Sequence, residues 1–226
     1  MKKPTRRDIA VASVAIGAVA AAGAQAQTPL AVDNASMGDV IQALAEGKTT
    51  ATALTKAYLA RIEAYDRGGP ALNSVRELNP EALAIAGRLD HIKPSAKQPL
   101  AGVPILVKDN IATGDKQHTT ACSLALETAR ARDDATVVKR LRAAGAVILG
   151  KTTMHELAAG ITTISSLTNQ TRNPYDLLRV PGGSSGGTGA AIGASFAAAG
   201  MGSDTCGSIR IPAANQNLVG LRGTHG

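Results

Sequence analysis

The sequence predicts an α/β fold, with a mixed and largely parallel sheet core flanked by helices. Short apolar runs alternate along the chain with stretches of helical periodicity, the pattern of strands and helices packed in layers. Aromatic residues make up only 2% of the chain and tryptophan is absent, so Ala, Val, Ile and Leu must fill the core. With 226 residues, of which 44% are hydrophobic and 18% charged, the chain can build one sizeable globular core.

The first predicted elements are two helices. Residues 36–46 and residues 50–66 both have helical periodicity. The second helix carries its larger apolar side chains on one face: Leu54, Tyr58, Ile62 and Tyr65. A Gly-Gly-Pro sequence at residues 68–70 ends this helix, because glycine and proline favour turns.

A strand, a third helix and a second strand follow. Residues 72–78 can form a strand. The Asn-Pro pair at residues 79–80 indicates a helix start, since asparagine caps helices and proline fits the first helical position. We expect this helix to end near residue 92. After a polar loop, residues 103–107 form a short apolar strand that leads directly into Lys108.

The next predicted unit is a helix at residues 134–144, stopped by Gly145, and a strand at residues 146–149. Residues 145–152 also match the phosphate-binding pattern of glycine, four residues and Gly-Lys-Thr. That motif needs a strand before its first glycine and a turn after it. Here a helix precedes the glycine and a strand-forming apolar run follows, so the sequence favours a helix and a strand over nucleotide binding.

The N-terminal residues 1–26 have the layout of a secretory signal peptide. Basic residues precede an apolar run at residues 9–22, and Ala-Gln-Ala stands at residues 24–26. The pair Arg6-Arg7 is similar to a twin-arginine export signal. The apolar run is shorter than the ~20 residues that span a bilayer. We therefore expect cleavage, a mature chain that is periplasmic or secreted, and no stable membrane insertion.

The net charge of +7 does not indicate a nucleic-acid partner. Four basic residues and one acidic residue lie within the predicted leader, so the mature chain carries only +4. The two cysteines, Cys122 and Cys206, would reach an oxidising compartment, and a disulfide between them is a hypothesis. The cysteines form no Cys-x-x-Cys pattern and the four histidines are isolated, so we expect no metal and no cofactor.

A glycine-rich segment at residues 180–191 contains two adjacent serines, Ser184 and Ser185. A flexible linker is disfavoured, because residues 188–200 have the small apolar composition of a buried helix. Residues 182–186 match the G-x-S-x-G nucleophile elbow of α/β-hydrolases, but the acid and histidine that must follow it have no good candidates downstream.

A lysine is the alternative activator of a serine. Burial disfavours the ammonium and lowers its pKa, which turns the amine into a base. Lys108 is the best candidate, because it ends an apolar strand at the position where active-site residues of α/β sheets lie. An exposed lysine after a strand is the alternative interpretation.

Three segments, in this order, resemble the blocks of the amidase signature family: residues 102–110, 182–187 and 202–214. The resemblance covers most of residues 36–226. It implies the amidase signature fold for residues 27–226, with the C-terminal part missing, since family members continue for about as much sequence again. The chain is therefore expected to be an incomplete domain.

The resemblance implies a Ser-Ser-Lys triad. Ser208 stands in the position of the nucleophile, Ser184 in the bridging position that follows a cis peptide bond in family members, and Lys108 in the position of the base. Four backbone amides would form the oxyanion hole: Thr205, Cys206, Gly207 and Ser208. The first cysteine of this chain, Cys122, and Cys206 replace glycines that are usual in the family. Structural roles are expected for Ser185, Asp204 and Arg210.

The activity that the resemblance implies is hydrolysis of a carboxylic amide C–N bond, other than a peptide bond, to an acid and ammonia or an amine. The substrate would be a small-molecule or peptide amide, and a homodimer is kept as a hypothesis. Three alternatives stay open: a peptide C-terminal amidase, a subunit of the tRNA amidotransferase type, and a catalytically silent fragment.

Overall fold

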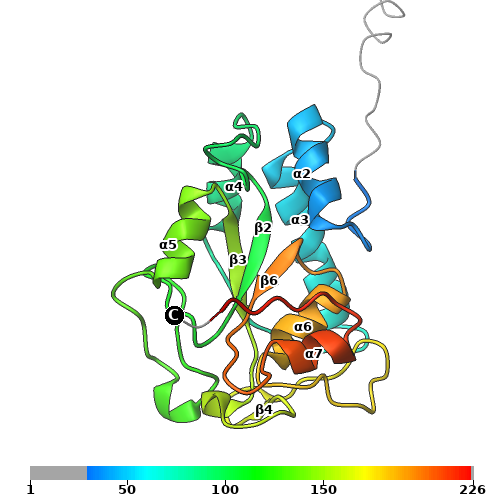
Figure 1. Ribbon diagram of the computed structural model, residues 1–226, viewed down its shortest axis with the longest axis vertical. Coiled ribbons are helices and arrows are strands. Elements are labelled where there is room, and N and C mark those ends of the chain that lie inside the picture. The colour runs from blue at the N-terminus through cyan, green and yellow to red at the C-terminus, as the bar shows by residue number, and fades with distance from the viewer. Residues whose placement is uncertain (1–29, 225–226) are drawn as a thin grey trace, which may run out of the picture.

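The computed structural model describes residues 30–224, which form a four-stranded sheet with the order β1-β3-β2-β6 (Figure 1). Strand β2 (Pro104–Lys108) pairs in parallel with β3 (Val147–Thr152) and with β6 (Ala199–Met201). Strand β1 (Val75–Leu78) is antiparallel to β3. The predicted mixed, largely parallel sheet is therefore confirmed. The predicted leader, residues 1–26, lies outside the described residues.

Helices cover both faces of this sheet (Figure 1). The α-helices of the described residues are α2 (Met37–Glu46), α3 (Ala51–Arg61), α4 (Ala82–Leu89), α5 (Thr136–Ala143), α6 (Gly186–Gly193) and α7 (Arg210–Asn215). Successive residues of a strand face opposite sides. Val107 and Ile148 accordingly pack with Val138 of α5, whereas Leu106 and Leu149 belong to the main core with α3 and α4. A separate hairpin pairs β4 (Ile164–Ser165) with β5 (Asn169–Gln170).

The first two helices begin where the sequence predicts them. Ser36 caps α2 by accepting the amide of Asp39, whose carboxylate accepts the amide of Ser36 in return. Thr50 caps α3 in the same way, through the amide of Ala53 at 3.1 Å. The second helix continues as a π-helix, η1 (Ile62–Arg67), to about the predicted end.

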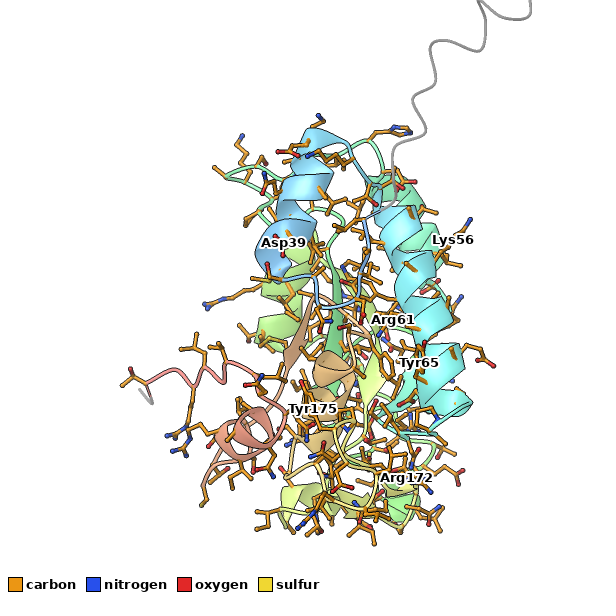
Figure 2. The ribbon with its side chains drawn as sticks, turned by 90° about the vertical axis from the view of Figure 1, so that its right-hand side faces the viewer. Asp39, Lys56, Arg61, Tyr65, Arg172 and Tyr175 are labelled. Atoms are coloured by element: carbon orange, nitrogen blue, oxygen red, sulfur yellow. The ribbon has the colours of Figure 1, made fainter. Side chains whose placement is uncertain are left out.

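Arg61 joins these helices to a distant part of the chain. Its side chain donates to the carbonyl oxygens of Ala194 and Ser195 at 3.0 and 3.1 Å and pairs with Asp33 at 2.9 Å. Figure 2 shows Arg61 next to Tyr65, and the guanidinium lies 5.3 Å from the centre of that ring. These contacts hold α3 against the turn that follows α6. No helix among residues 30–224 has the length and apolar character needed to cross a membrane.

Two element boundaries differ from the prediction. The first strand begins at Val75 rather than at residue 72, because the amides of residues 72–74 donate to the carbonyl oxygens of Tyr65 and Asp66 and to the Asp66 carboxylate instead of to a neighbouring strand. The third helix is shorter at both ends than the predicted 79–92. Asn79 still acts at its start, where its side-chain oxygen accepts the amide of Glu81 at 2.9 Å.

The buried helix that composition indicated for residues 188–200 forms only over the first part of that range. Helix α6 begins earlier, inside the glycine-rich segment, and ends at Gly193, while the last residues of the range belong to strand β6. The physical reason is close packing of α6 on β6. A Cβ atom at Gly200 would lie 2.4 Å from the methyl carbon of Thr188. The small residues serve this contact rather than one continuous helix.

The helix-and-strand interpretation of residues 145–152 is confirmed. Helix α5 ends before Gly145, which has a positive φ of 90°, and β3 then extends through Lys151 and Thr152, beyond the predicted strand end at residue 149. The Lys151 side chain is fully buried. Its Nζ donates to the carbonyl oxygen of Ile111 at 2.6 Å and to Oγ1 of Thr119 at 3.0 Å. Lys151 thus holds the loop after β2 instead of facing a phosphate site.

Candidate active site

Lys108 and Ser184 meet in the interior of the protein. Strand β2 is buried along its whole length, and its last residue, Lys108, has no exposed surface. Its Nζ lies 2.6 Å from Oγ of Ser184, which is also fully buried. Burial lowers the pKa of Lys108 from 10.5 to about 8, and the nearby Cys122 and Asp204 oppose this shift only in part. A buried lysine with a depressed pKa can accept a proton near neutral pH.

The glycine-rich segment places Ser184 against β2. The peptide bond between Gly183 and Ser184 is cis, as the resemblance implies. Further along, the backbone of α6 runs directly over the end of β3. A Cβ atom at Gly187 would lie 2.1 Å from Oγ1 of Thr153. Glycine is required there because the helix and the strand end approach so closely.

A third hydroxyl, that of Ser203, shares the lysine with Ser184. Lys108 Nζ donates to Ser203 Oγ at 2.8 Å and lies 3.5 Å from the Ser203 carbonyl oxygen. Asn110 Nδ2 donates to the same hydroxyl at 3.0 Å. These contacts arise because β2 and β6 are parallel neighbours, with Val107 opposite Met201. The residues that follow the two strands therefore leave the sheet at the same edge. Sequence reasoning missed Ser203 and Asn110.

Ser185 has the bracing role that the sequence predicts. Its hydroxyl donates to the carbonyl oxygen of Ser203 at 3.2 Å and accepts the Ser203 amide at 3.3 Å. Its own amide donates to the carbonyl oxygen of Ser208 at 3.1 Å. Ser185 therefore ties the segment that carries Ser203 and Ser208 to the start of α6.

The structure brings the backbone of Ser208 to this site but leaves its hydroxyl apart from the other two. Ser208 is half-buried, and within residues 30–224 no hydrogen bond links its hydroxyl to Ser184 or Lys108. Of the three residues that the resemblance assigns to the triad, two are in direct contact. The third lies on the adjoining loop, which Ser185 holds in place.

Asp204 organises that loop. Its carboxylate accepts the amides of Gly207 at 2.9 Å, Ile209 at 3.0 Å and Arg210 at 3.3 Å. It also pairs with the Arg210 guanidinium at 3.1 Å, which holds the pKa of Asp204 well below its usual range. The structural roles expected for Asp204 and Arg210 agree with these contacts.

The amides expected to form an oxyanion hole are not equivalent in the structure. The Gly207 amide is engaged by Asp204, so it is not free in this arrangement. The amides of Thr205, Cys206 and Ser208 have no acceptor within the described part of the chain. Thr205 and Cys206 are exposed residues.

The disulfide hypothesis for the two cysteines is wrong in this structure. Both are free thiols, Cys122 buried and Cys206 exposed. The Cys122 amide donates to the carboxylate of Asp109 at 2.9 Å, which holds this residue in the core. Burial, with the charge of Asp109, raises the pKa of the Cys122 thiol to about 12, so it stays protonated.

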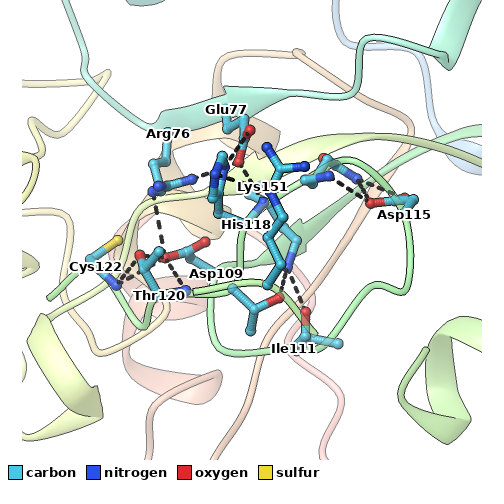
Figure 3. A network of polar contacts seen from close by, with 12 residues as sticks. Arg76, Glu77, Asp109, Ile111, Asp115, His118, Thr120, Cys122 and Lys151 are labelled. Carbon is cyan, nitrogen blue, oxygen red and sulfur yellow. Dashed lines mark hydrogen bonds and ion pairs between the residues drawn. The ribbon is translucent and has the colours of Figure 1, made fainter. Parts of the chain in front are cut away.

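A second polar network contains Asp109, the neighbour of Lys108 in the chain (Figure 3). Asp109, which follows Lys108, is fully buried and accepts hydrogen bonds from the hydroxyl of Thr120 and the amide of Cys122. Arg76 lies 3.7 Å from it and also pairs with Glu77 at 2.7 Å. No cluster among the described residues has enough His, Cys, Asp and Glu side chains to hold a metal ion. The network anchors the loop after β2.

Comparisons with known proteins found a matching family model, similar curated proteins and similar solved structures. A family model described as Amidase matches residues 53–226. A glutamyl-tRNA(Gln) amidotransferase subunit from Limosilactobacillus fermentum is 47% identical over 180 residues, which make up 79% of this chain and 36% of that protein. Many solved structures are similar to this chain. The peptide amidase of Stenotrophomonas maltophilia has a TM-score of 0.77 and 44% identity, with 82% of this chain and 39% of that chain covered. The corresponding glutamyl-tRNA(Gln) amidotransferase subunit from Thermotoga maritima has a TM-score of 0.67 and 35% identity, with 81% and 37% covered.

Proposed function

Because the chain belongs to the amidase signature family, we propose that it hydrolyses a carboxylic amide C–N bond to an acid and ammonia or an amine. The reaction passes through an acyl-enzyme on a serine. The matched part of the chain spans 36% of the length of the amidotransferase subunit from Limosilactobacillus fermentum and 39% of that of the peptide amidase, so the proposal concerns the chemistry of the part present here.

In the proposed mechanism Ser208 attacks the amide carbonyl carbon. Its hydroxyl proton passes to Oγ of Ser184, whose own proton passes to Nζ of Lys108. The tetrahedral intermediate collapses when the proton returns by the same route to the leaving nitrogen. The C–N bond breaks, and an ester to Ser208 remains. Water then attacks this ester with Lys108 again as the final base, which frees the acid and restores the Ser208 hydroxyl.

The single observation that carries the proposal is the contact of Lys108 Nζ with Ser184 Oγ at 2.6 Å. With its pKa lowered to about 8, roughly a tenth of the Lys108 side chains are neutral at pH 7. An exposed lysine would be neutral in fewer than about one molecule in a thousand. The proposal requires the Ser208 hydroxyl to reach Ser184 when the substrate binds.

The negative oxygen of the intermediate is proposed to accept hydrogen bonds from the loop amides. Those of Thr205, Cys206 and Ser208 are free to point at it, and that of Gly207 joins them only if it leaves Asp204. Such donors stabilise a transition state because they are already oriented before charge develops.

The relatives suggest two substrate classes. One matched structure is a peptide amidase, which favours a peptide amide as substrate. The curated relatives named as amidotransferase subunits favour a second candidate, a subunit that works on a tRNA-linked substrate. We prefer a small-molecule or peptide amide, because the leader expected at residues 1–26 would send the chain to the periplasm or outside the cell. A catalytically silent fragment is the third alternative.

The test is hydrolysis of three amide classes by the 226-residue chain: a simple aliphatic amide, a C-terminally amidated dipeptide and glutamine. Released ammonia is measured for the wild type, for Ser208→Ala and for the control Ser95→Ala on an exposed loop. We expect release that Ser208→Ala abolishes and Ser95→Ala leaves unchanged. Release that survives in Ser208→Ala would contradict the proposed nucleophile, and no release from any amide would favour the silent fragment.

A further inference from the structure

We infer that Ser203 is a positioning residue for Lys108, which it orients so that the lone pair of the amine faces the Ser184 hydroxyl. This inference rests on the proposed function, in which Lys108 takes a proton from Ser184. It concerns a residue that neither transfers a proton nor touches the substrate in that mechanism.

The number of oxygen atoms around Lys108 Nζ leads to this role. Three of them surround the nitrogen: Ser184 Oγ at 2.6 Å, Ser203 Oγ at 2.8 Å and the Ser203 carbonyl oxygen at 3.5 Å. An ammonium has three N–H groups and can donate one to each. A neutral amine has only two N–H groups and one lone pair. When both N–H groups point to Ser203, the lone pair is left for the hydroxyl hydrogen of Ser184.

Asn110 fixes the Ser203 hydroxyl from its other side. Its Nδ2 donates to Ser203 Oγ at 3.0 Å, so this oxygen accepts from two nitrogen atoms at once. A hydroxyl oxygen has two lone pairs, and both are then occupied. The Ser203 oxygen is thereby held as an acceptor toward Lys108, while the Ser184 hydroxyl has Lys108 as its hydrogen-bond partner among the described residues.

Ser185 holds the segment of Ser184 and the segment of Ser203 together. It binds both the amide and the carbonyl oxygen of Ser203, and it directly follows Ser184 in the chain. The adjacent serines therefore both act on Lys108, Ser184 by direct contact and Ser185 through Ser203. Because Ser185 joins the segment of Ser184 to the segment of Ser203, a shift of one segment must move the other, and the geometry at Lys108 Nζ is preserved.

The oxygen atoms that accept hydrogen bonds from Lys108 Nζ carry no charge, and this property keeps the amine able to act as a base. A carboxylate beside Lys108 would favour the ammonium by charge and raise its pKa, whereas a hydroxyl orients the nitrogen with less effect. The titratable groups that act on Lys108 are Cys122, which is buried and protonated, and Asp204, whose carboxylate is engaged by Arg210. Ser203 thus holds the amine in place without fixing it as a cation.

The test compares Ser203→Ala, Ser203→Thr and the control Ser95→Ala, with kcat and KM for the amide that the wild type hydrolyses. For Ser203→Ala we expect kcat to fall by about 10- to 100-fold, because Lys108 is no longer aligned with Ser184. KM should stay within about twofold of the wild type, because Ser203 does not touch the substrate. Ser203→Thr keeps the hydroxyl and should stay within about threefold of the wild type. A folded Ser203→Ala variant with wild-type kcat would overturn the inference.

A second measurement does not depend on turnover. The pKa of Lys108 is followed by NMR of 15Nζ-labelled lysine and assigned with Lys108→Met. Ser203→Ala should lower it, because the ammonium loses an acceptor, and Ser203→Thr should restore it. An unchanged pKa overturns the inference even if amides are hydrolysed. If the wild type hydrolyses no amide but the pKa still falls, the proposed function fails while the contact stands. If Ser203→Ala does not fold, Ser203→Cys replaces it, since a thiol is a weak acceptor of similar shape.

Discussion

The side-chain nitrogen of Lys108 lies 2.6 Å from the hydroxyl oxygen of Ser184, although the two residues are 76 positions apart in the sequence. The contact joins the end of a central strand to the start of helix α6. Neither partner has exposed surface, so water cannot replace either one. The lysine therefore has the serine as a fixed partner.

Replacing the lysine separates its chemical role from a structural one. Lys108→Met should reduce amide hydrolysis by about 10²- to 10⁴-fold, the usual contribution of a general base. The folded state should be kept, because methionine fills similar volume and removes a buried amine from an apolar strand. Turnover and thermal denaturation check both parts. Loss of activity together with loss of folding would leave the chemical role unsupported and contradict this prediction.

The pH dependence of hydrolysis should follow the titration of Lys108. Its pKa is lowered to about 8, so kcat/KM should rise with pH and level off above about pH 8. A rate that is flat between pH 6 and 9 would contradict a lysine base.

Stability should change with pH in the same direction. In the unfolded chain lysine binds its proton up to about pH 10.5, whereas folded Lys108 releases it near pH 8. Between these values the unfolded state binds more protons, so the free energy of unfolding should increase as pH rises through this window. Lys151, with a pKa lowered to about 8 by burial, adds to the same trend. Urea denaturation at pH 7.5 and 9.5 measures the free energy of unfolding at the two ends of this window. The increase between the two pH values should be smaller in Lys108→Met than in the wild type.

The close approach of α6 to the end of β3 should make Gly187 intolerant of a side chain. A Cβ atom there would lie 2.3 Å from the carbonyl oxygen of Thr153, so Gly187→Ala should lower the free energy of unfolding by about 1 to 3 kcal/mol. The control is Gly38→Ala in α2, where the nearest atom would be 3.5 Å away. There, alanine should stabilise by up to about 1 kcal/mol. Equal effects at the two glycines would contradict the packing argument.

The two thiols should differ in reactivity. Cys206 is exposed and should react with a thiol reagent in the native protein, whereas buried Cys122 should react only after denaturation. Counting thiols in unreduced protein, native and then in guanidinium, should give one and then two. No reactive thiol after denaturation without reductant would restore the disulfide hypothesis.

The sequence was informative where a feature is local. Caps at Ser36 and Thr50 marked helix starts, and the apolar run before Lys108 predicted a buried strand that ends at this lysine, although it left the burial of the lysine side chain open. Features that depend on strand pairing were not accessible. Ser203 follows β6, a strand that the small-residue composition had suggested was helix, so its place beside Lys108 could not be foreseen. The engagement of the Gly207 amide by Asp204 depends on loop geometry in the same way.

The central claim is that Ser208 is the nucleophile and Ser184 the relay, and an active-site label tests it most directly. A fluorophosphonate probe reacts covalently with an activated serine, and the labelled site is then located by tandem mass spectrometry. Trypsin releases residues 180–210 as one peptide that contains both serines, so fragmentation must assign the adduct. The account predicts an adduct on Ser208 that is absent in Ser208→Ala and strongly reduced in Lys108→Met. An adduct on Ser184 that persists in Ser208→Ala would contradict it.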